Sequence, residues 1–154
     1  MSTEDPQGGL SETEDRESPA FSLEVFDPSD PSHWEAIRAD IVSMELDEWG
    51  EEEGFDEEML TNDFNNPKNV VVVLKDETIG KIIGFTYAEP LFELIESNIR
   101  KGIIREDGGH NTAYISDTLI HPTYRGRHLV GDMMSLLEDG LRARGFRFIE
   151  EILR

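Results

Sequence analysis

The chain has 154 residues, no cysteine and a formal net charge of −20, with 34 acidic residues against 14 lysines and arginines. This length suits one domain with a single core, and the lack of cysteine excludes disulfides, thiolate metal ligands and a cysteine nucleophile, as fits a cytoplasmic protein. So negative a charge disfavours nucleic acid and anionic membranes as partners, and it either favours cationic partners or simply keeps the protein soluble.

The chain divides at about residue 20. Residues 1–20 are acidic and poor in apolar side chains, so we predict a disordered tail there rather than a signal or transit peptide. The periodic patterns of a folded domain begin after it, because residues 21–26 alternate apolar and polar side chains as a strand does. No stretch approaches the ~18–20 consecutive apolar residues of a membrane helix.

Two helices are predicted next. Ser32 and Glu35 have the spacing of a capping box, and Gly50 is a typical helix stop, so the first helix runs between them. Its apolar stripe consists of Trp34, Ile37, Ile41 and Met44. Residues 54–67 predict a second, short helix that ends at Pro67. Its apolar face consists of Phe55, Met59, Leu60 and Phe64.

A hairpin and a third helix follow. The β-branched run of residues 69–74 predicts a buried strand, and a polar turn joins it to a second strand at residues 81–90. Residues 91–104 predict a short helix and residues 105–111 a loop. The apolar face of this helix consists of Leu91, Ile95 and Ile99.

The last elements are a strand, a helix and a strand, at residues 112–120, 129–144 and 146–153. Gly145 is the expected C-cap of the helix. The predicted core stripe of the helix consists of Leu129, Val130, Met133, Leu137 and Leu141.

The segment between the first two of these elements, HPTYRGRHLVG at residues 121–131, is basic in an otherwise acidic chain; we call it the basic loop. A helix N-terminus presents unpaired N–H groups and about half a positive charge. Gly126 lets the backbone approach a ligand, and Arg125, Arg127 and His128 add donors, so the loop could hold a pyrophosphate. It matches neither a Walker nor a Rossmann pattern. The alternative is a solvated loop that balances acidic neighbours.

This region resembles the GCN5-related N-acetyltransferase (GNAT) superfamily. The stretch ISDTLIHPTYRGRHLVGDMMSLLEDGLRARGF is similar to the acetyl-CoA motif of that family, and VVVVLKDETIGKIIGFTYAEP is similar to its central hairpin, with Gly84 in the usual IxGF position. The resemblance covers residues 21–154. It implies an α/β domain with a mostly antiparallel, twisted sheet flanked by helices, and acetyl-CoA as co-substrate. The four histidines are scattered, so we expect no metal.

The resemblance also implies where acetyl-CoA binds. The pantetheine arm would pair with the backbone near Leu119 and Ile120, in a gap between the strands at 112–120 and 146–153. The residues implied for the pyrophosphate are Arg125, Gly126, Arg127, His128, Leu129, Val130 and Gly131. Two of them depart from the family pattern Arg/Gln-x-x-Gly-x-Gly/Ala, because His128 and Val130 stand at the two glycine positions. A Cβ at position 128 would either crowd the phosphates or remove a positive-φ conformation, or else His128 donates to the phosphates.

The acceptor amine must lose a proton before it attacks, because an alkylammonium has a pKa near ~10. By resemblance the base lies on the strand at 112–120, where Asp117 is the only acid; Glu89, on the neighbouring strand, is the second candidate. The alternative is that Asp117 only pairs with an arginine. A backbone N–H near Leu119 would stabilise the oxyanion.

The acceptor side has one further clue. Ten acidic residues and no Lys or Arg lie between Glu45 and Asp63, a stretch we call the acidic segment. In GNAT enzymes the corresponding helices border the acceptor, so we expect an N-acetyltransferase for a primary amine of a cationic small molecule or a protein. A solvated outer face is the alternative for the segment. For the whole chain, the alternatives are a non-catalytic acetyl-CoA-binding or regulatory module and a structural protein.

GNAT domains usually continue past the strand that residues 146–153 resemble. They add a helix, which often supplies a tyrosine near the leaving thiol, and a hairpin that completes the sheet. The chain ends at Arg154, so we expect a domain that is incomplete at its C-terminus and has an exposed edge at 146–153. Such a domain would be weakly active or inactive, and either marginally stable or paired as a homodimer through that edge.

Overall fold

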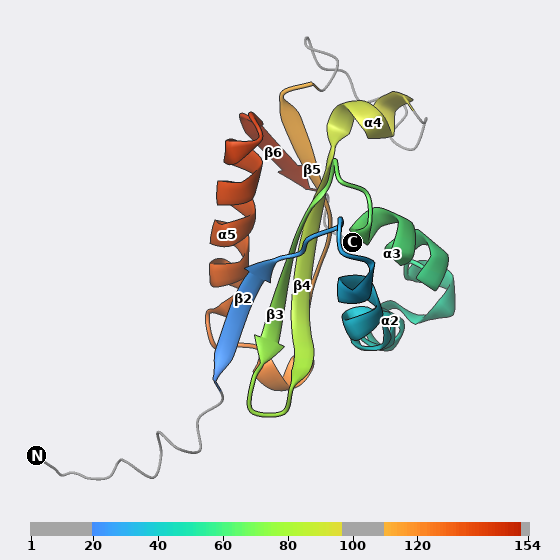
Figure 1. Cartoon of the computed structure of the whole chain (residues 1–154), viewed down its shortest axis with the longest axis vertical. Coiled ribbons are helices and arrows are strands. Elements are labelled where there is room, and N and C mark those ends of the chain that lie inside the picture. The colour runs from blue at the N-terminus through green and yellow to red at the C-terminus, as the bar shows by residue number, and fades with distance from the viewer. Residues whose placement is uncertain (1–19, 97–109, 152–154) are drawn as a thin grey trace, which may run out of the picture.

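The computed structural model describes residues 20–96 and 110–151, which form one five-stranded sheet with helices on both faces (Figure 1). The order is β2-β3-β4-β5-β6, and neighbouring strands pair antiparallel except β5 and β6, which are parallel. The strand bounds are β2 Phe21–Val25, β3 Val70–Asp76, β4 Lys81–Pro90, β5 Thr112–Ile120 and β6 Phe148–Glu151. The predicted α/β fold with a mostly antiparallel sheet is therefore confirmed.

Helices α2 and α3 cover one face of the sheet and α5 covers the other, so the molecule has two main core layers (Figure 1). The helix bounds are α2 Pro31–Glu53, α3 Glu57–Phe64, α4 Leu91–Glu96 and α5 Leu129–Ala143, with a 3₁₀ turn at Pro122–Tyr124. None of the helices in the described ranges combines the length and the apolar character that crossing a bilayer requires.

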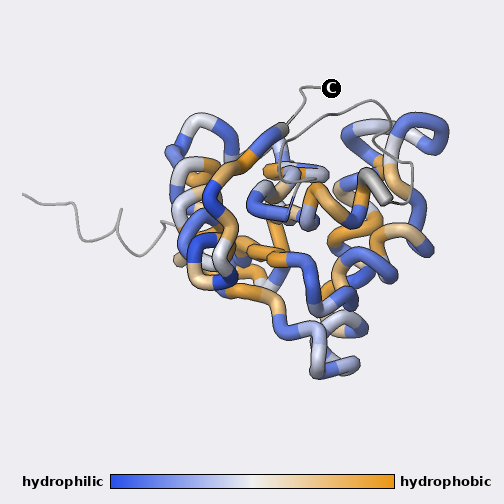
Figure 2. The backbone as a smooth tube through the Cα atoms, turned by 90° about the horizontal axis from the view of Figure 1, so that it is seen from above, coloured by the Kyte–Doolittle hydropathy of each residue, from blue (hydrophilic) through white to orange (hydrophobic). Residues whose placement is uncertain are grey.

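The valine run of β3 serves both core layers. Val71 and Val73 pack in the layer under α2 and α3, while Val70 and Val72 pack in the layer under α5. A strand covered on both faces reads as a continuous apolar run rather than an alternating one. Figure 2 shows the apolar segments running through the interior and the hydrophilic ones at the outer turns.

Gly84 of β4 is required by the packing of α5. A Cβ at this position would lie 3.2 Å from the Leu119 carbonyl oxygen and 3.3 Å from the Met133 sulfur. Both distances are tighter than ordinary contacts, so a larger residue would push α5 away from the sheet. This close approach gives a physical reason for the glycine in the IxGF position.

Helix α2 begins earlier than the capping box predicted. Asp30 is the N-cap, and its Oδ1 accepts hydrogen bonds from the backbone N of Ser32 at 3.0 Å and from its Oγ at 2.7 Å. Glu35 does not reach back to Ser32 but pairs with Arg38 at 3.1 Å. The predicted box is therefore wrong, because Pro31 suits the first helical position and lets Asp30 cap the helix instead.

The C-terminal part of α2 is broken where a stop was predicted. Gly50 has φ 80° and ψ 176°, which interrupts the helix, yet helical geometry resumes as far as Glu53. The N–H of Gly54 then donates to the Gly50 carbonyl at 3.1 Å. The second helix, α3, starts three residues later than predicted, at Glu57, because Asp56 caps it by accepting from the Met59 N–H at 2.8 Å.

Two of the predicted apolar faces contain one wrong residue each. Met59 is 45% exposed and Val130 is 41% exposed. Each precedes or follows a buried leucine, Leu60 or Leu129, and one residue turns the side chain by about 100° around the helix. The buried residues of α5 are Leu129, Met133, Leu137 and Leu141.

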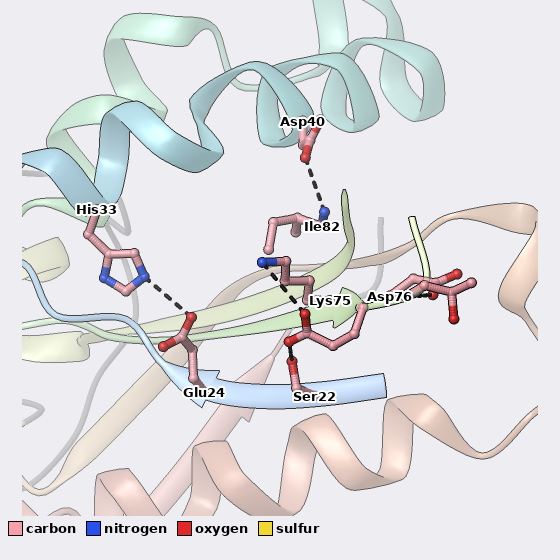
Figure 3. Close-up of polar contacts among 9 residues, drawn as sticks. Ser22, Glu24, His33, Asp40, Lys75, Asp76 and Ile82 are labelled. Atoms are coloured by element: carbon pink, nitrogen blue, oxygen red, sulfur yellow. Dashed lines mark hydrogen bonds and ion pairs between the residues drawn. The ribbon is translucent and has the colours of Figure 1, made fainter. Parts of the chain in front are cut away.

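Helix α2 is fixed to the sheet by a side chain as well as by its apolar stripe. The Asp40 carboxylate accepts a hydrogen bond from the backbone N of Ile82 in β4, at 3.0 Å (Figure 3). The pairing of β3 with β4 shifts by one residue between Leu74 and Lys75, beside this point. Asp40 therefore anchors α2 at an irregularity of the β3–β4 hairpin.

Parts of several predicted elements lie outside the described residues. These parts are residues 1–19 of the predicted tail, 97–104 of the predicted third helix, 105–109 of the following loop and 152–153 of the last strand. Within the described ranges, α4 buries Leu91 and Leu94 together with Tyr114. The last strand starts at Phe148, two residues later than predicted.

Candidate active site

The site is organised by a bulge in the middle of β5. In the pairing of β4 with β5, Ala88 lies opposite Ile115 and Tyr87 lies opposite Asp117, so Ser116 is an extra residue without a partner position. Strand β6 pairs with β5 only from Thr112 to Ile115 within the described residues. Beyond Ile115, and so beyond the bulge, the described residues of β6 provide no further partner for β5.

The part of β5 beyond the bulge contains the residues predicted to contact the pantetheine arm. Leu119 and Ile120 follow the bulge and pair with β4 on one side, opposite Phe85 and Gly84. On the side of β6 they have no strand partner among the described residues. An extended ligand could add to this free edge as a further strand would.

The basic loop continues directly from the end of β5 into α5. Gly126 has φ 81° and His128 has φ 62°, and α5 begins at Leu129. His128 is the only residue other than glycine with a positive φ in the described ranges. The predicted loss of a positive-φ conformation at His128 is therefore wrong, although this conformation costs a non-glycine residue roughly 1–2 kcal/mol.

A hollow of about 600 Å³ lies at this loop, in front of the N-terminus of α5. Its lining residues are Ile120, Tyr124, Arg125, Gly126, His128, Leu129 and Val130. Six of these residues belong to the set predicted to bind acetyl-CoA, and the remaining one, Tyr124, was not predicted. Of the predicted set, Arg127 and Gly131 are exposed beside the hollow rather than part of its lining.

Tyr124 anchors the loop to the sheet. Its hydroxyl donates to the buried carboxylate of Asp76 at the end of β3, with Oη and Oδ2 2.6 Å apart. This hydrogen bond lowers the pKa of Asp76 and raises the pKa of Tyr124. The guanidinium of Arg127 lies 5.5 Å from the centre of the Tyr124 ring, within range of a cation–π contact.

Arg125 connects the loop to two other elements. Its Nε donates to the carbonyl of Ile120 at 3.2 Å, and its Nη2 donates to Oε1 of Glu48, in α2, at 2.7 Å. Glu48 also lines a second pocket, of about 420 Å³, between α2 and the end of β5. The other residues that line it are Met44, Asp47, Leu119, Ile120, His121 and Pro122. Both pockets share Ile120, so they meet at the end of β5.

The two predicted catalytic acids lie on the sheet face that α2 and α3 cover. Asp117 is only 4% exposed. Glu89 accepts a short hydrogen bond from the hydroxyl of Ser116, the bulge residue. The charges of both acids contribute to raising the pKa of Tyr87, so the structure brings them together around that side chain.

Asp63 and Tyr87 belong to the same cluster but were not predicted. The Tyr87 hydroxyl donates to Oδ2 of Asp63, in α3, at 2.8 Å. Burial raises the pKa of Asp63, and burial together with the Asp63 charge raises the pKa of Tyr87 well above its usual value. No spacing in the sequence indicates this pair, because 24 positions separate its members and only the packing of α3 on the sheet joins them.

Residues 34–152 match the model of the Acetyltransferase (GNAT) family. This match covers more than half of the chain, so the chain belongs to the GNAT family of acetyl-CoA-dependent N-acetyltransferases.

Solved structures share the fold at low sequence identity. A Trypanosoma brucei acetyltransferase matches with a TM-score of 0.58 and 16% identity, over 88% of this chain and 84% of that one. AAC(6')-Iy, solved with the bisubstrate analogue CoA-S-monomethyl-acetylneamine, matches with a TM-score of 0.60 and 12% identity, over 88% and 80%. A ribosomal-protein-alanine N-acetyltransferase from Brucella melitensis biovar Abortus 2308 matches with a TM-score of 0.58 and 10% identity, over 88% and 81%.

A search of curated protein sequences finds no match to this chain. In the part of the chain that the structure describes, no three His, Asp or Glu side chains are grouped so that they could hold a metal ion.

Proposed function

We propose that this chain transfers the acetyl group of acetyl-CoA to the primary amine of a cationic acceptor, either a small molecule or a protein amine. One observation carries the proposal: β5 continues past the Ser116 bulge directly into the positive-φ loop and the N-terminus of α5, and there it pairs with β4 but with no second strand among the described residues. An acyl-CoA that lies along this path has its thioester beside the pocket between α2 and β5.

The residues at the path fit acetyl-CoA. Leu119 and Ile120 pair with β4 on one side, and the backbone at this end of β5 would meet the pantetheine arm on the other. Because the His121 N–H donates to the Ile83 carbonyl and backbone groups alternate along a strand, Ile120 is the residue of the two that points its N–H and C=O away from β4. The hollow at the basic loop offers N–H groups at the start of α5, with the cationic Arg125 in its lining and Arg127 beside it, to a pyrophosphate. His128 keeps the backbone conformation of the glycine that it replaces, which supports binding despite the departure from the family pattern.

In the proposed reaction the acceptor nitrogen attacks the thioester carbon. The ammonium first gives one proton to a protein group or to water; the C–N bond then forms, the C–S bond breaks, and the departing thiolate takes up the second proton that the nitrogen loses, so coenzyme A leaves as the thiol. Asp117 is the proposed proton acceptor and Glu89 the second candidate; both belong to the acid cluster around Tyr87. A backbone N–H near Leu119 would stabilise the oxyanion.

Charge supports a cationic acceptor. Asp47 and Glu48 line the pocket between α2 and the end of β5, and α2 and α3 carry the acidic segment. A carboxylate-rich entrance raises the local concentration of cations. The matched structures include AAC(6')-Iy with its acetylneamine analogue and a ribosomal-protein-alanine N-acetyltransferase, so small cations and protein amines both belong in the test.

The test is calorimetric titration with acetyl-CoA and with desulfo-coenzyme A, followed by an assay of thiol release with an amine panel. The panel contains a polyamine, an aminoglycoside, and peptides with a free lysine or N-terminal amine. We expect binding of both coenzymes and turnover with at least one amine. Binding without turnover would support the alternative of a non-catalytic acetyl-CoA-binding or regulatory module. Absence of binding would contradict the proposal.

We also propose a cytoplasmic location and a homodimer that pairs through β6. Phe148 is 58% exposed and Ile149 is 38% exposed on this strand. Within the described residues, β6 pairs on one side only, with β5. Light scattering tests the dimer, and a monomer at all concentrations would exclude it.

A further inference from the structure

One ion pair joins the two sides of the proposed site. Glu48 belongs to α2, which borders the proposed acceptor pocket, and Arg125 belongs to the basic loop, which borders the proposed pyrophosphate hollow. Glu48 Oε1 and Arg125 Nη2 are 2.7 Å apart, although 77 positions separate the residues in the sequence.

Arg125 is held at several points. Its guanidinium donates to Glu48 with one nitrogen and to the carbonyl of Ile120 with another, and its backbone N donates to the Pro122 carbonyl at 3.2 Å. The guanidinium therefore bridges the end of β5 and α2. Its side chain is 48% exposed and that of Glu48 is 33% exposed, so solvent screens the pair and its value lies in geometry more than in stability.

Glu48 carries a negative charge, as the pyrophosphate does, so the sign of its effect on coenzyme A affinity tests its role. A carboxylate close to a pyrophosphate site should by itself weaken the binding of an anion, because like charges repel. The contact with Arg125 offsets that repulsion and fixes the guanidinium in one position. Asp47, the preceding residue in α2, lines the same pocket but makes no ion pair within the described ranges.

We propose that Glu48 is a positioning residue: it holds Arg125 at the end of β5 and so couples α2, on the acceptor side, to the loop that binds the coenzyme. This inference rests on the proposed binding of acetyl-CoA to the basic loop. It assigns Glu48 a role in coenzyme binding although the residue carries the same sign of charge as the ligand.

The test is a double-mutant cycle on coenzyme A affinity, measured by calorimetry with wild type, Glu48→Gln, Arg125→Gln and the double variant. We expect each single variant to bind coenzyme A about three- to tenfold more weakly, the range of a partly exposed charged pair. The double variant should bind coenzyme A no more weakly than the single variant with the lower affinity, because both substitutions break the same interaction. Glu35→Gln is the matched control, because it removes another α2 glutamate that pairs with an arginine, Arg38, at 3.1 Å but does not line either pocket. We expect Glu35→Gln to bind coenzyme A as tightly as wild type.

Thermal unfolding of each variant without ligand separates positioning from a loss of structure. We expect midpoints within a few degrees of wild type, roughly 2–4 °C at this chain length for a pair worth 1 kcal/mol. If wild type binds coenzyme A and Glu48→Gln binds it equally well or more tightly, the positioning role is wrong and the proposed function stands. If wild type binds no coenzyme A, the proposed function fails, and this inference fails with it.

Discussion

The hydroxyl of Tyr124 and the buried carboxylate of Asp76 are 2.6 Å apart and tie the basic loop to the end of β3. Because the bond holds the pKa of Asp76 below its value in the unfolded chain, the carboxylate contributes stability above the ordinary aspartate pKa of ~3.9. This contribution is lost as the pH falls through the lowered pKa of the folded state. We therefore expect the free energy of unfolding of wild type to fall more steeply below pH ~4 than that of Tyr124→Phe.

Urea unfolding at a series of pH values between about 3 and 7 measures this difference. Asp139→Asn is the control, because Asp139 is exposed and pairs with Arg142 only at 3.5 Å. Parallel curves for wild type and Tyr124→Phe would show that the bond to Asp76 does not form in solution.

The positive φ of His128 predicts a strong dependence on side-chain shape. A β-branched residue is much harder to accommodate at φ 62° than histidine, whereas glycine adopts this conformation freely. We expect His128→Val to lower the free energy of unfolding by about 1–2 kcal/mol relative to His128→Gly, and to weaken coenzyme A binding. Arg127→Val in the same loop, where φ is not positive, should show no comparable loss of stability. Equal stability of the two His128 variants would contradict the left-handed conformation.

Asp117 and Glu89 can be separated by kinetics. If Asp117 accepts the proton, Asp117→Asn should lower kcat by about 10²–10⁴-fold, the usual value of a general base. Coenzyme A affinity should not change, because Asp117 lies on the α2 and α3 face, away from the basic loop. Glu89→Gln should have the smaller effect. The reverse order would transfer the role to Glu89, and ordinary activity in both variants would mean that water takes the proton.

The acidic segment gives a prediction about salt. If its charges attract a cationic acceptor, kcat/KM should fall as ionic strength rises, because exposed charges are screened over ~8–10 Å near physiological salt. Neutralising the exposed Glu51 and Glu52 together should flatten this dependence. Neutralising Glu138 and Asp139 on α5, which covers the other face of the sheet, is the matched control. A rate that does not respond to salt would favour the alternative of a solvated outer face.

Features that depend on residues close together in the chain could be predicted from the sequence, whereas contacts between distant segments could not. The valine run of β3 and the four-residue repeat of α5 are local patterns, and both were predicted correctly except for Val130. The Asp63–Tyr87 and Glu48–Arg125 contacts join segments that only the tertiary fold brings together, so no local spacing could indicate them.

The start of α2 was predicted wrongly for a different reason, because two local patterns competed for it. Asp30 and the predicted Ser32 box both satisfy the local rules for a helix start, and the proline between them decides in favour of Asp30. The exposed Val130 shows the same limit on a helix face. It is as apolar as its neighbours, and only the direction of the sheet determines which side of α5 is buried.

The extra residue at position 116 has a consequence for how β5 tolerates insertions and deletions. Before it, the odd-numbered Ala113 and Ile115 face α5; after it, the even-numbered Ile120 faces α5, while the odd-numbered Leu119 faces α2 and α3. In β5, odd-numbered side chains therefore face α5 before Ser116 and even-numbered side chains face α5 after it; we call these the two phases of the strand. A substitution of Ser116 leaves both phases intact. A deletion of Ser116 would remove the bulge and join both phases into one regular alternation, in which Asp117 and Leu119 still face α2 and α3 and Ile120 still faces α5. Deletion of a paired residue such as Thr118 would instead turn the residues beyond it to the opposite face, so the strand tolerates the loss of only its unpaired position without exchanging its two faces.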